Sequence, residues 1–206
     1  MQQVPRDLFM ACEDAYYSGD EKGRVQSSTF IKGHRPSAAG QIKHFRINEA
    51  FYEALKAQGA EPSALKGTKL VIGRSGMFNV ARLNVPSHKW VNLGRSATRK
   101  KLAELNASIS RKYVQRDFFT DAVEPTGGTL FIVGVMDAVD ENGIAQLSEV
   151  MLALPAPDMK SWIYRKSISN FVNLYDRVDT IVQLDNALPT LKKQIKKQTG
   201  NDQGNQ

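Results

Sequence analysis

The alternation of hydrophobic and polar residues divides the N-terminal third of the chain into two predicted helices and two predicted strands. Apolar residues recur at steps of three and four over residues 5–18, which predicts a helix that ends before the first glycines. A second helix is predicted from the capping residue Asn48 to Gln58. Between these helices, residues 27–32 and 41–47 are predicted to form strands on either side of a glycine-bounded loop.

The middle of the chain combines a strand pair with a long helix. Residues 69–74 and 78–85 are predicted to pair around a Ser-Gly turn, and residues 89–93 are a candidate third strand. Ser96 is a good helix-capping residue, and the apolar positions that follow it keep helical spacing to about residue 118. We therefore expect one helix over this stretch, with most of its lysines and arginines on the face away from the apolar residues.

The strongest local pattern is a hairpin formed by residues 129–139 and 144–154. Asn142-Gly143 joins these two runs, and Asn-Gly is a strong signal for a tight hairpin turn. The first run is apolar almost throughout, which predicts a central strand buried on both faces. Residues 159–168 fit either a helix or a loop.

The C-terminal part has hydrophobic residues near heptad spacing over residues 174–195, although Pro189 would kink a helix there. Such a helix could pack on the sheet of its own chain or mediate self-association in a larger complex. Residues 200–206 are polar and are predicted to be a disordered tail. Together the elements predict a single α+β domain over residues 1–199, with a mostly antiparallel sheet packed with three or four helices.

Composition limits the classes of protein that the chain can belong to. Hydrophobic residues make up 41% and charged residues 24%, which is ordinary for a globular domain. The apolar runs are far too short to span a bilayer, and no apolar signal segment follows the N-terminus. Cys12 is the single cysteine, which excludes an intramolecular disulfide and a cysteine-based zinc site. These features predict a cytoplasmic protein with no membrane partner.

Charge is distributed unevenly along the chain. Residues 22–116 carry 19 Lys and Arg against four Glu, a net charge of +15. Residues 117–159 carry eight acids and no Lys or Arg, a net charge of −8. The acidic stretch could fold against the basic one and neutralise it, or the basic stretch could bind a polyanion. The second interpretation is favoured, and nucleic acid is the polyanion it indicates.

The candidate binding residues lie in this basic stretch, where aromatic residues are interleaved with cations. Nucleic acids are bound by Lys and Arg on phosphates and by aromatic rings on bases. Trp90 is the best candidate for stacking on a base, whereas Phe30, Phe45 and Phe78 are expected in the core. The predicted nucleic-acid-binding residues are Lys32, His34, Arg35, Lys43, Arg46, Arg74, Arg82, Lys89, Trp90, Arg95, Arg99, Lys100 and Lys101.

Evidence for catalysis is weaker than evidence for binding. The chain lacks a P-loop and a nucleophile elbow, and its three histidines have no carboxylates near them in sequence, so no metal site or cofactor is predicted. A metal-independent ribonuclease using His34 or His44 remains an alternative, as does a subunit of a charge-paired assembly. The leading hypothesis is a DNA- or RNA-binding protein that reads backbone and shape, in a phage, mobile-element or ribonucleoprotein system.

Overall fold

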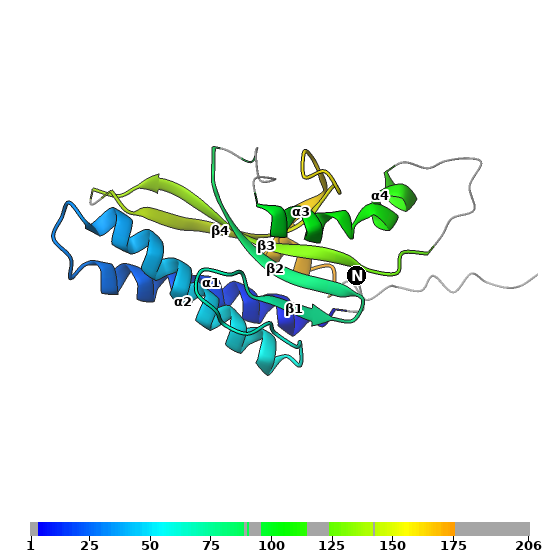
Figure 1. Ribbon diagram of the computed structural model, residues 1–206, viewed down its shortest axis with the longest axis horizontal. Helices are drawn as coiled ribbons and strands as arrows, with labels where there is room; N and C mark the ends of the chain where they lie inside the picture. The colour runs from blue at the N-terminus through cyan, green and yellow to red at the C-terminus, as the bar shows by residue number, and fades with distance from the viewer. Residues whose placement is uncertain (1–3, 89, 91–95, 115–123, 142, 176–206) are drawn as a thin grey trace, which may run out of the picture. The chain divides into compact units, whose positions relative to one another are not determined.

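The computed structural model describes residues 4–88, 90, 96–114, 124–141 and 143–175. This part of the chain forms five helices and one five-stranded, mostly antiparallel sheet, which confirms the predicted α+β class (Figure 1). The elements are α1 (Arg6–Ser27), α2 (Arg35–Ala57), β1 (Ile72–Ser75), β2 (Phe78–Pro86), α3 (Ala97–Glu104), α4 (Ala107–Tyr113), β3 (Gly128–Val139), β4 (Ala145–Pro155), β5 (Trp162–Ser167) and α5 (Ile168–Val172).

Helices α1 and α2 form a tightly packed helical hairpin (Figure 1). Two glycines of α1 make the close approach possible. A Cβ atom on Gly19 would lie 2.6 Å from the Cα of Ile47, and one on Gly23 would lie 2.7 Å from the Cα of Lys43. The glycines therefore mark a helix–helix contact and do not end the helix.

The strands predicted over residues 27–32 and 41–47 are wrong. Helix α1 continues past both glycines to Ser27, and α2 begins at Arg35 with a proline in its first turn. Five of the six buried residues of α2 recur every fourth position, at Ala39, Lys43, Ile47, Phe51 and Leu55, and Asn48 is the sixth. This period buries one helical face, and it includes a lysine that a purely hydrophobic pattern does not count.

The sheet has the strand order β1-β2-β3-β4-β5, and only β2 and β3 run parallel. Strand β3 lies in the centre and is buried on both faces, as its apolar sequence predicts. The predicted hairpin of β3 and β4 is confirmed, and Gly143 adopts a φ of 75° in its turn. The segment that fitted a helix or a loop contains β5, which is an edge strand.

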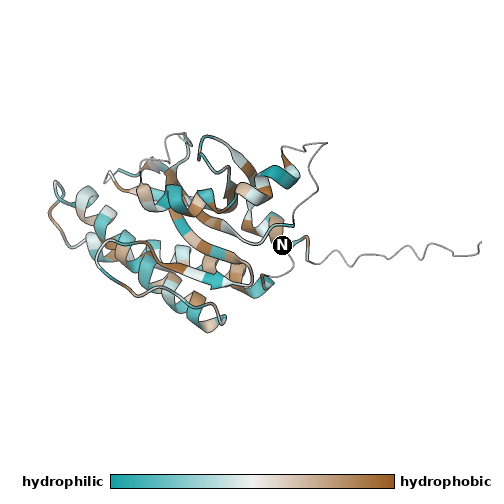
Figure 2. Cartoon of the chain, turned by 45° about the vertical axis from the view of Figure 1, so that its right-hand side comes forward, coloured by the Kyte–Doolittle hydropathy of each residue, from teal (hydrophilic) through white to brown (hydrophobic). Residues whose placement is uncertain are grey.

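Hydrophobic cores lie on both faces of the sheet, and Figure 2 shows hydrophobic residues running along the central strands. One core joins the sheet to α1 and α2, and the other joins it to α3. No helix among the described residues combines the length and hydrophobicity that a bilayer crossing requires.

The crossover between the parallel strands β2 and β3 contains α3 and α4 in place of the single helix predicted from Ser96. Ser96 caps α3 as expected, because its Oγ accepts from the backbone N of Arg99 at 3.5 Å. Asn106 then interrupts the helix. Its buried side chain donates to the backbone O of Thr129 (3.2 Å) and of Pro155 (2.9 Å) and accepts from the N of Thr129 (2.6 Å). These bonds fix the chain to the sheet between the two helices.

Three predicted features lie outside the described residues: the strand over residues 89–93 apart from Trp90, the helix over 174–195 beyond Tyr175, and the tail over 200–206.

Candidate functional site

A buried arginine lies at the point where β2 becomes the edge of the sheet. The pairing of β1 with β2 ends at Ala81, one residue before Arg82. Arg82 is 1% exposed, and its side chain bonds to α2. Its Nε donates to Asn48 Oδ1 at 2.6 Å, and its Nη2 donates to His44 Nδ1 at 3.0 Å and to the His44 backbone O at 2.8 Å. These contacts hold the guanidinium group in one orientation beneath the edge.

His44 is held by bonds to both of its ring nitrogens. Because Nδ1 accepts from Arg82, Nε2 carries the proton and donates to the backbone O of Thr68 at 3.2 Å. Burial and the charge of Arg82 lower the pKa of His44, with a smaller contribution from Arg99, while the bond to Thr68 opposes the shift. His44 is therefore neutral at pH 7, and neither nitrogen is available to take a proton from a substrate.

Arg99, in the first turn of α3, lies close enough to Arg82 and His44 for its charge to act on both. Its side chain is partly buried, and its guanidinium has no hydrogen bond or ion pair within the part of the chain that the structure describes. The Nε atom is fully buried without a partner. Burial and the nearby charge of Arg82 lower the pKa of Arg99. We call Arg82 and Arg99, together with the neutral His44, the cationic cluster.

The cationic cluster has no counter-charge among the described residues. None of the described ion pairs includes Arg82 or Arg99. The acidic group that interacts with both arginines is the phenol of Tyr16. Burial raises the pKa of Tyr16, so this phenol is uncharged at pH 7 and does not balance their charge. Burying cations without an anion is unfavourable, and an anion that contacts Arg99 would relieve that cost.

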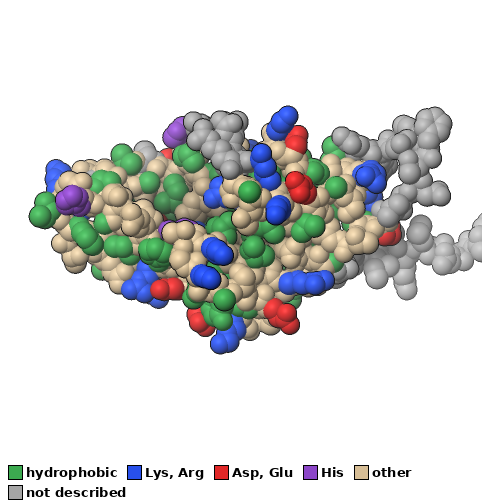
Figure 3. Space-filling view, in the orientation of Figure 1, with side chains coloured by type: hydrophobic (Ala, Val, Ile, Leu, Met, Phe, Trp, Pro, Cys, Tyr) green, Lys and Arg blue, Asp and Glu red, His purple; other side chains and the backbone are tan. Residues whose placement is uncertain are grey.

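Further cations surround the cluster. Asn48 donates to the backbone O of Lys69 at 3.1 Å, which fixes the chain before β1 beside the cluster. In Figure 3, Lys and Arg side chains lie over α3 and over the stretch that leads into β1. The exposed cations of these elements that have no ion pair among the described residues are Lys66, Lys69, Arg74, Lys100 and Lys101.

Lys43 and Arg46 were predicted as binding residues but are engaged within the fold. Lys43 is 4% exposed, and its Nζ lies 2.7 Å from Asp20 Oδ1 and donates to the backbone O of Ala145 at 2.7 Å. Arg46 pairs with Glu49 at 2.7 Å. Their charges are already compensated, in contrast to those of the cationic cluster.

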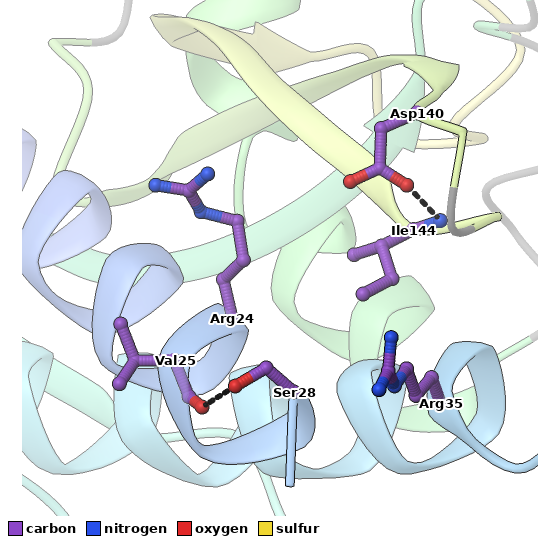
Figure 4. A pocket seen from close by; sticks show the side chains of 6 residues that line it. All are labelled: Arg24, Val25, Ser28, Arg35, Asp140 and Ile144. Carbon is purple, nitrogen blue, oxygen red and sulfur yellow. Dashed lines mark hydrogen bonds between the residues drawn. The ribbon is translucent and has the colours of Figure 1, made fainter. Parts of the chain in front are cut away.

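Lys32, His34 and Arg35 lie at the connection between α1 and α2, apart from the cationic cluster. Arg35 lines a hollow of about 290 Å³ together with Arg24 and Asp140 (Figure 4). Glu21 is the main cause of the raised pKa of Arg24, and the Asp140 carboxylate adds a small contribution. Because a carboxylate lines this hollow, it is a weaker anion site than the cationic cluster.

Trp90 packs against two residues that the sequence did not single out. Its ring meets the ring of Trp162 edge-on at 5.5 Å, and the guanidinium of Arg165 lies over it at 4.6 Å. The run of aromatic and branched residues in β5 was the available signal for this contact. The neighbouring candidates Lys89 and Arg95 lie outside the described residues.

The three phenylalanines expected in the core differ in the structure. Phe78 is 6% exposed and lies in the core, as expected. Phe30 and Phe45 are 44% and 41% exposed, so that expectation is wrong for them. Phe45 lies on α2 outside its buried face, and Phe30 lies in the turn after α1, because neither segment forms a strand.

Searches against protein families, curated proteins and solved structures find no match to this chain. Within the described residues, no group of three or more His, Cys, Asp or Glu side chains could hold a metal ion. The interpretation of the site therefore depends on its own contacts and charges.

The lowered pKa of His44 predicts that the fold loses stability in mild acid. The unfolded chain takes up the His44 proton near its ordinary pKa of about 6.5, before the folded chain does, so the free energy of unfolding falls as the pH drops through that value. Urea unfolding at about pH 7 and pH 5.5 measures the loss, which should be smaller for His44→Gln. An NMR titration that placed the His44 pKa at or above its ordinary value would contradict the prediction.

Proposed function

We propose that this protein binds nucleic acid, DNA or RNA, through its phosphates, with the cationic cluster at the centre of the contact surface. The observation that carries the proposal is the guanidinium of Arg99, which has no partner in the described structure and lies near the buried, carboxylate-free Arg82. A guanidinium binds phosphate oxygens through paired hydrogen bonds. A phosphate on Arg99 would supply the anion that no described residue provides to the cluster.

A polymer of phosphates accounts for the surroundings better than a single small anion does. Cations with no ion pair in the described part of the chain continue beyond the cluster, at Lys66 and Lys69 before β1 and at Lys100 and Lys101 on α3. Neutralising several phosphates releases counterions and gives much of the affinity of backbone-reading proteins. The protein would serve a phage, mobile-element or ribonucleoprotein system and act in the cytoplasm.

Binding without catalysis is the form of this function that the geometry favours. The ribonuclease alternative needs a histidine that can exchange a proton with the substrate. Both ring nitrogens of His44 are hydrogen-bonded within the fold. His34 is exposed at the start of α2, apart from the cationic cluster, and no contact there favours catalysis. We therefore propose a binding protein and not an enzyme.

Replacing Arg99 by alanine is expected to weaken binding to single- and double-stranded DNA or RNA by about tenfold, because one phosphate contact is lost. The slope of log affinity against log salt should fall by about one for the same reason. Fluorescence anisotropy with labelled oligonucleotides at several salt concentrations measures both quantities. Lys22→Ala is the matched control, because Lys22 is an exposed cation in the groove between α1 and α2.

An affinity that does not change with salt, or no binding even at low salt, would overturn the proposal. Equal losses for Arg99→Ala and Lys22→Ala would show that only net charge matters and that the cluster is not the site. Size-exclusion chromatography of the protein alone at low and high salt tests the alternative that the protein is a subunit of a charge-paired assembly. Salt-sensitive association of copies without nucleic acid would support that alternative.

A further inference from the structure

A second feature of nucleic-acid recognition lies on the face of the sheet that α3 covers. Leu102 and Ala103 of α3 pack into the same core as Trp90 and Trp162. Arg99, from the same helix, belongs to the cationic cluster at the edge of β2. Helix α3 is thus shared between a phosphate-binding cluster and an aromatic cluster.

The aromatic cluster consists of Trp90, Trp162 and Arg165. Trp162 supports Trp90 edge-on, with an interplanar angle of 78°, and the guanidinium of Arg165 lies 4.6 Å from the centre of the Trp90 ring. Arg165 is exposed, and no described carboxylate pairs with it. Because Arg165 is exposed, the guanidinium over the indole ring can be reached from the solvent, and nucleic-acid bases stack on arginine planes.

Strand geometry places Arg165 on this face. Arg165 pairs with Ala153, whose side chain belongs to the core beneath α3, whereas Lys166 pairs with Leu152 of the opposite core. Alternate residues of a strand point to opposite faces, so Arg165 and Lys166 point away from each other. Only Arg165 is therefore part of the aromatic cluster, and Lys166 is a natural control.

We infer that Trp90 and Arg165 form a stacking platform for an unpaired base, so that the preferred ligand is single-stranded nucleic acid. This inference rests on the proposed function, because the phosphates of the same strand would be held by Arg99 and the lysines of α3. In a duplex the base faces are covered by neighbouring base pairs and cannot reach the platform. In a single strand they are free to stack on arginine or aromatic planes.

The test compares three ligands at one salt concentration: a single-stranded oligonucleotide, an abasic strand of the same length, and the corresponding duplex. The abasic strand keeps the phosphates but has no bases to stack. The intact single strand should bind at least about fivefold more tightly than the abasic strand. Its binding should also quench tryptophan fluorescence, and the quenching should persist in Trp162→Phe because Trp90 is the other of the chain's two tryptophans.

Arg165→Lys separates the platform from its charge, because lysine keeps the positive charge but has no planar group. This variant should lose most of the preference for the intact strand over the abasic strand, while its affinity for the abasic strand stays within about twofold of the wild type. Lys166→Gln should keep the preference. Urea unfolding of each variant shows that the fold is retained.

The failure of the platform and the failure of the proposed function give different results. Equal affinity for intact and abasic strands, or an unchanged preference in Arg165→Lys, would overturn the platform while phosphate binding stands. A duplex bound as tightly as the single strand would overturn the preference for single strands. If none of the three ligands binds even at low salt, the proposed function itself is wrong, and this inference falls with it.

Discussion

Asp20→Ala should lower the free energy of unfolding by about 3–5 kcal/mol, because it leaves the buried ammonium group of Lys43 without its anion. The side chains of the pair are only 6% and 12% exposed for Lys43 and Asp20, so water cannot replace the lost partner. Lys43 would keep its bond to the backbone O of Ala145, which is a neutral acceptor and does not balance the charge. Urea denaturation followed by circular dichroism measures the change.

The neighbouring residue Glu21 provides a matched control. It pairs with Arg24, and both side chains are about half exposed, so Glu21→Ala should cost little. The double variant Asp20→Ala, Lys43→Met should recover most of the stability, because a methionine fills the space without a buried charge. A loss in Asp20→Ala no larger than that in Glu21→Ala would contradict this account of the pair.

The elements that could be predicted from sequence are those whose signals are local. The hairpin of β3 and β4 follows from a turn sequence between two apolar runs, and the cap of α3 follows from Ser96. The first two helices were predicted too short, because glycine breaks a helix in most sequences. In this chain Gly19 and Gly23 are required by the contact between α1 and α2, which is a tertiary effect that the local pattern does not contain.

The candidate site was predictable in its residue types but not in its arrangement. Arg82 and Arg99 were both named from the basic stretch, yet the same reasoning named Lys43 equally. The difference is a carboxylate: Asp20 lies 23 positions before Lys43 and pairs with it, whereas no described acid pairs with Arg82 or Arg99. Sequence composition counts charges, and only the fold decides which of them are compensated.

Arg165 illustrates the same limit. It lies outside the basic stretch over residues 22–116 and was not considered, although it contacts Trp90, which was. The contact depends on β5 pairing with β4, which brings residues 75 positions apart in sequence together. The aromatic and branched residues of β5 could indicate a strand, but its pairing over such separations has no local signal, so the contact itself could be recognised only in the structure.

Tyr16→Phe is expected to be the second strongly destabilising change, with a loss of about 2–4 kcal/mol. The Tyr16 hydroxyl reaches the parallel strands β2 and β3, where it lies 3.0 Å from the O of Leu83 and 2.9 Å from the O of Ile132. It also accepts from the backbone N of Leu83 at 3.1 Å. Phenylalanine fills the same space but leaves a buried N–H and a carbonyl group without partners.

The absence of a side chain on Gly134 leaves room for this ring, since a Cβ there would lie 2.5 Å from Tyr16 Cε1. The Tyr16 ring therefore fits between β2 and β3. Its hydroxyl takes the place of a direct backbone hydrogen bond between these two strands. Tyr17→Phe is the control, because Tyr17 is 45% exposed and makes no described hydrogen bond. A loss in Tyr16→Phe no larger than in Tyr17→Phe would contradict the bridging role.

The pH dependence gives an independent test of the same hydroxyl. Burial raises the pKa of Tyr16 in the folded chain, so the unfolded chain releases this proton first, near the ordinary pKa of about 10. The stability that Tyr16 contributes is present below that pH and is lost as the pH rises above it. Tyr16→Phe should therefore lose less stability than the wild type between about pH 9 and pH 11, as measured by urea unfolding. Parallel losses in the two proteins would show that Tyr16 does not titrate as its burial requires.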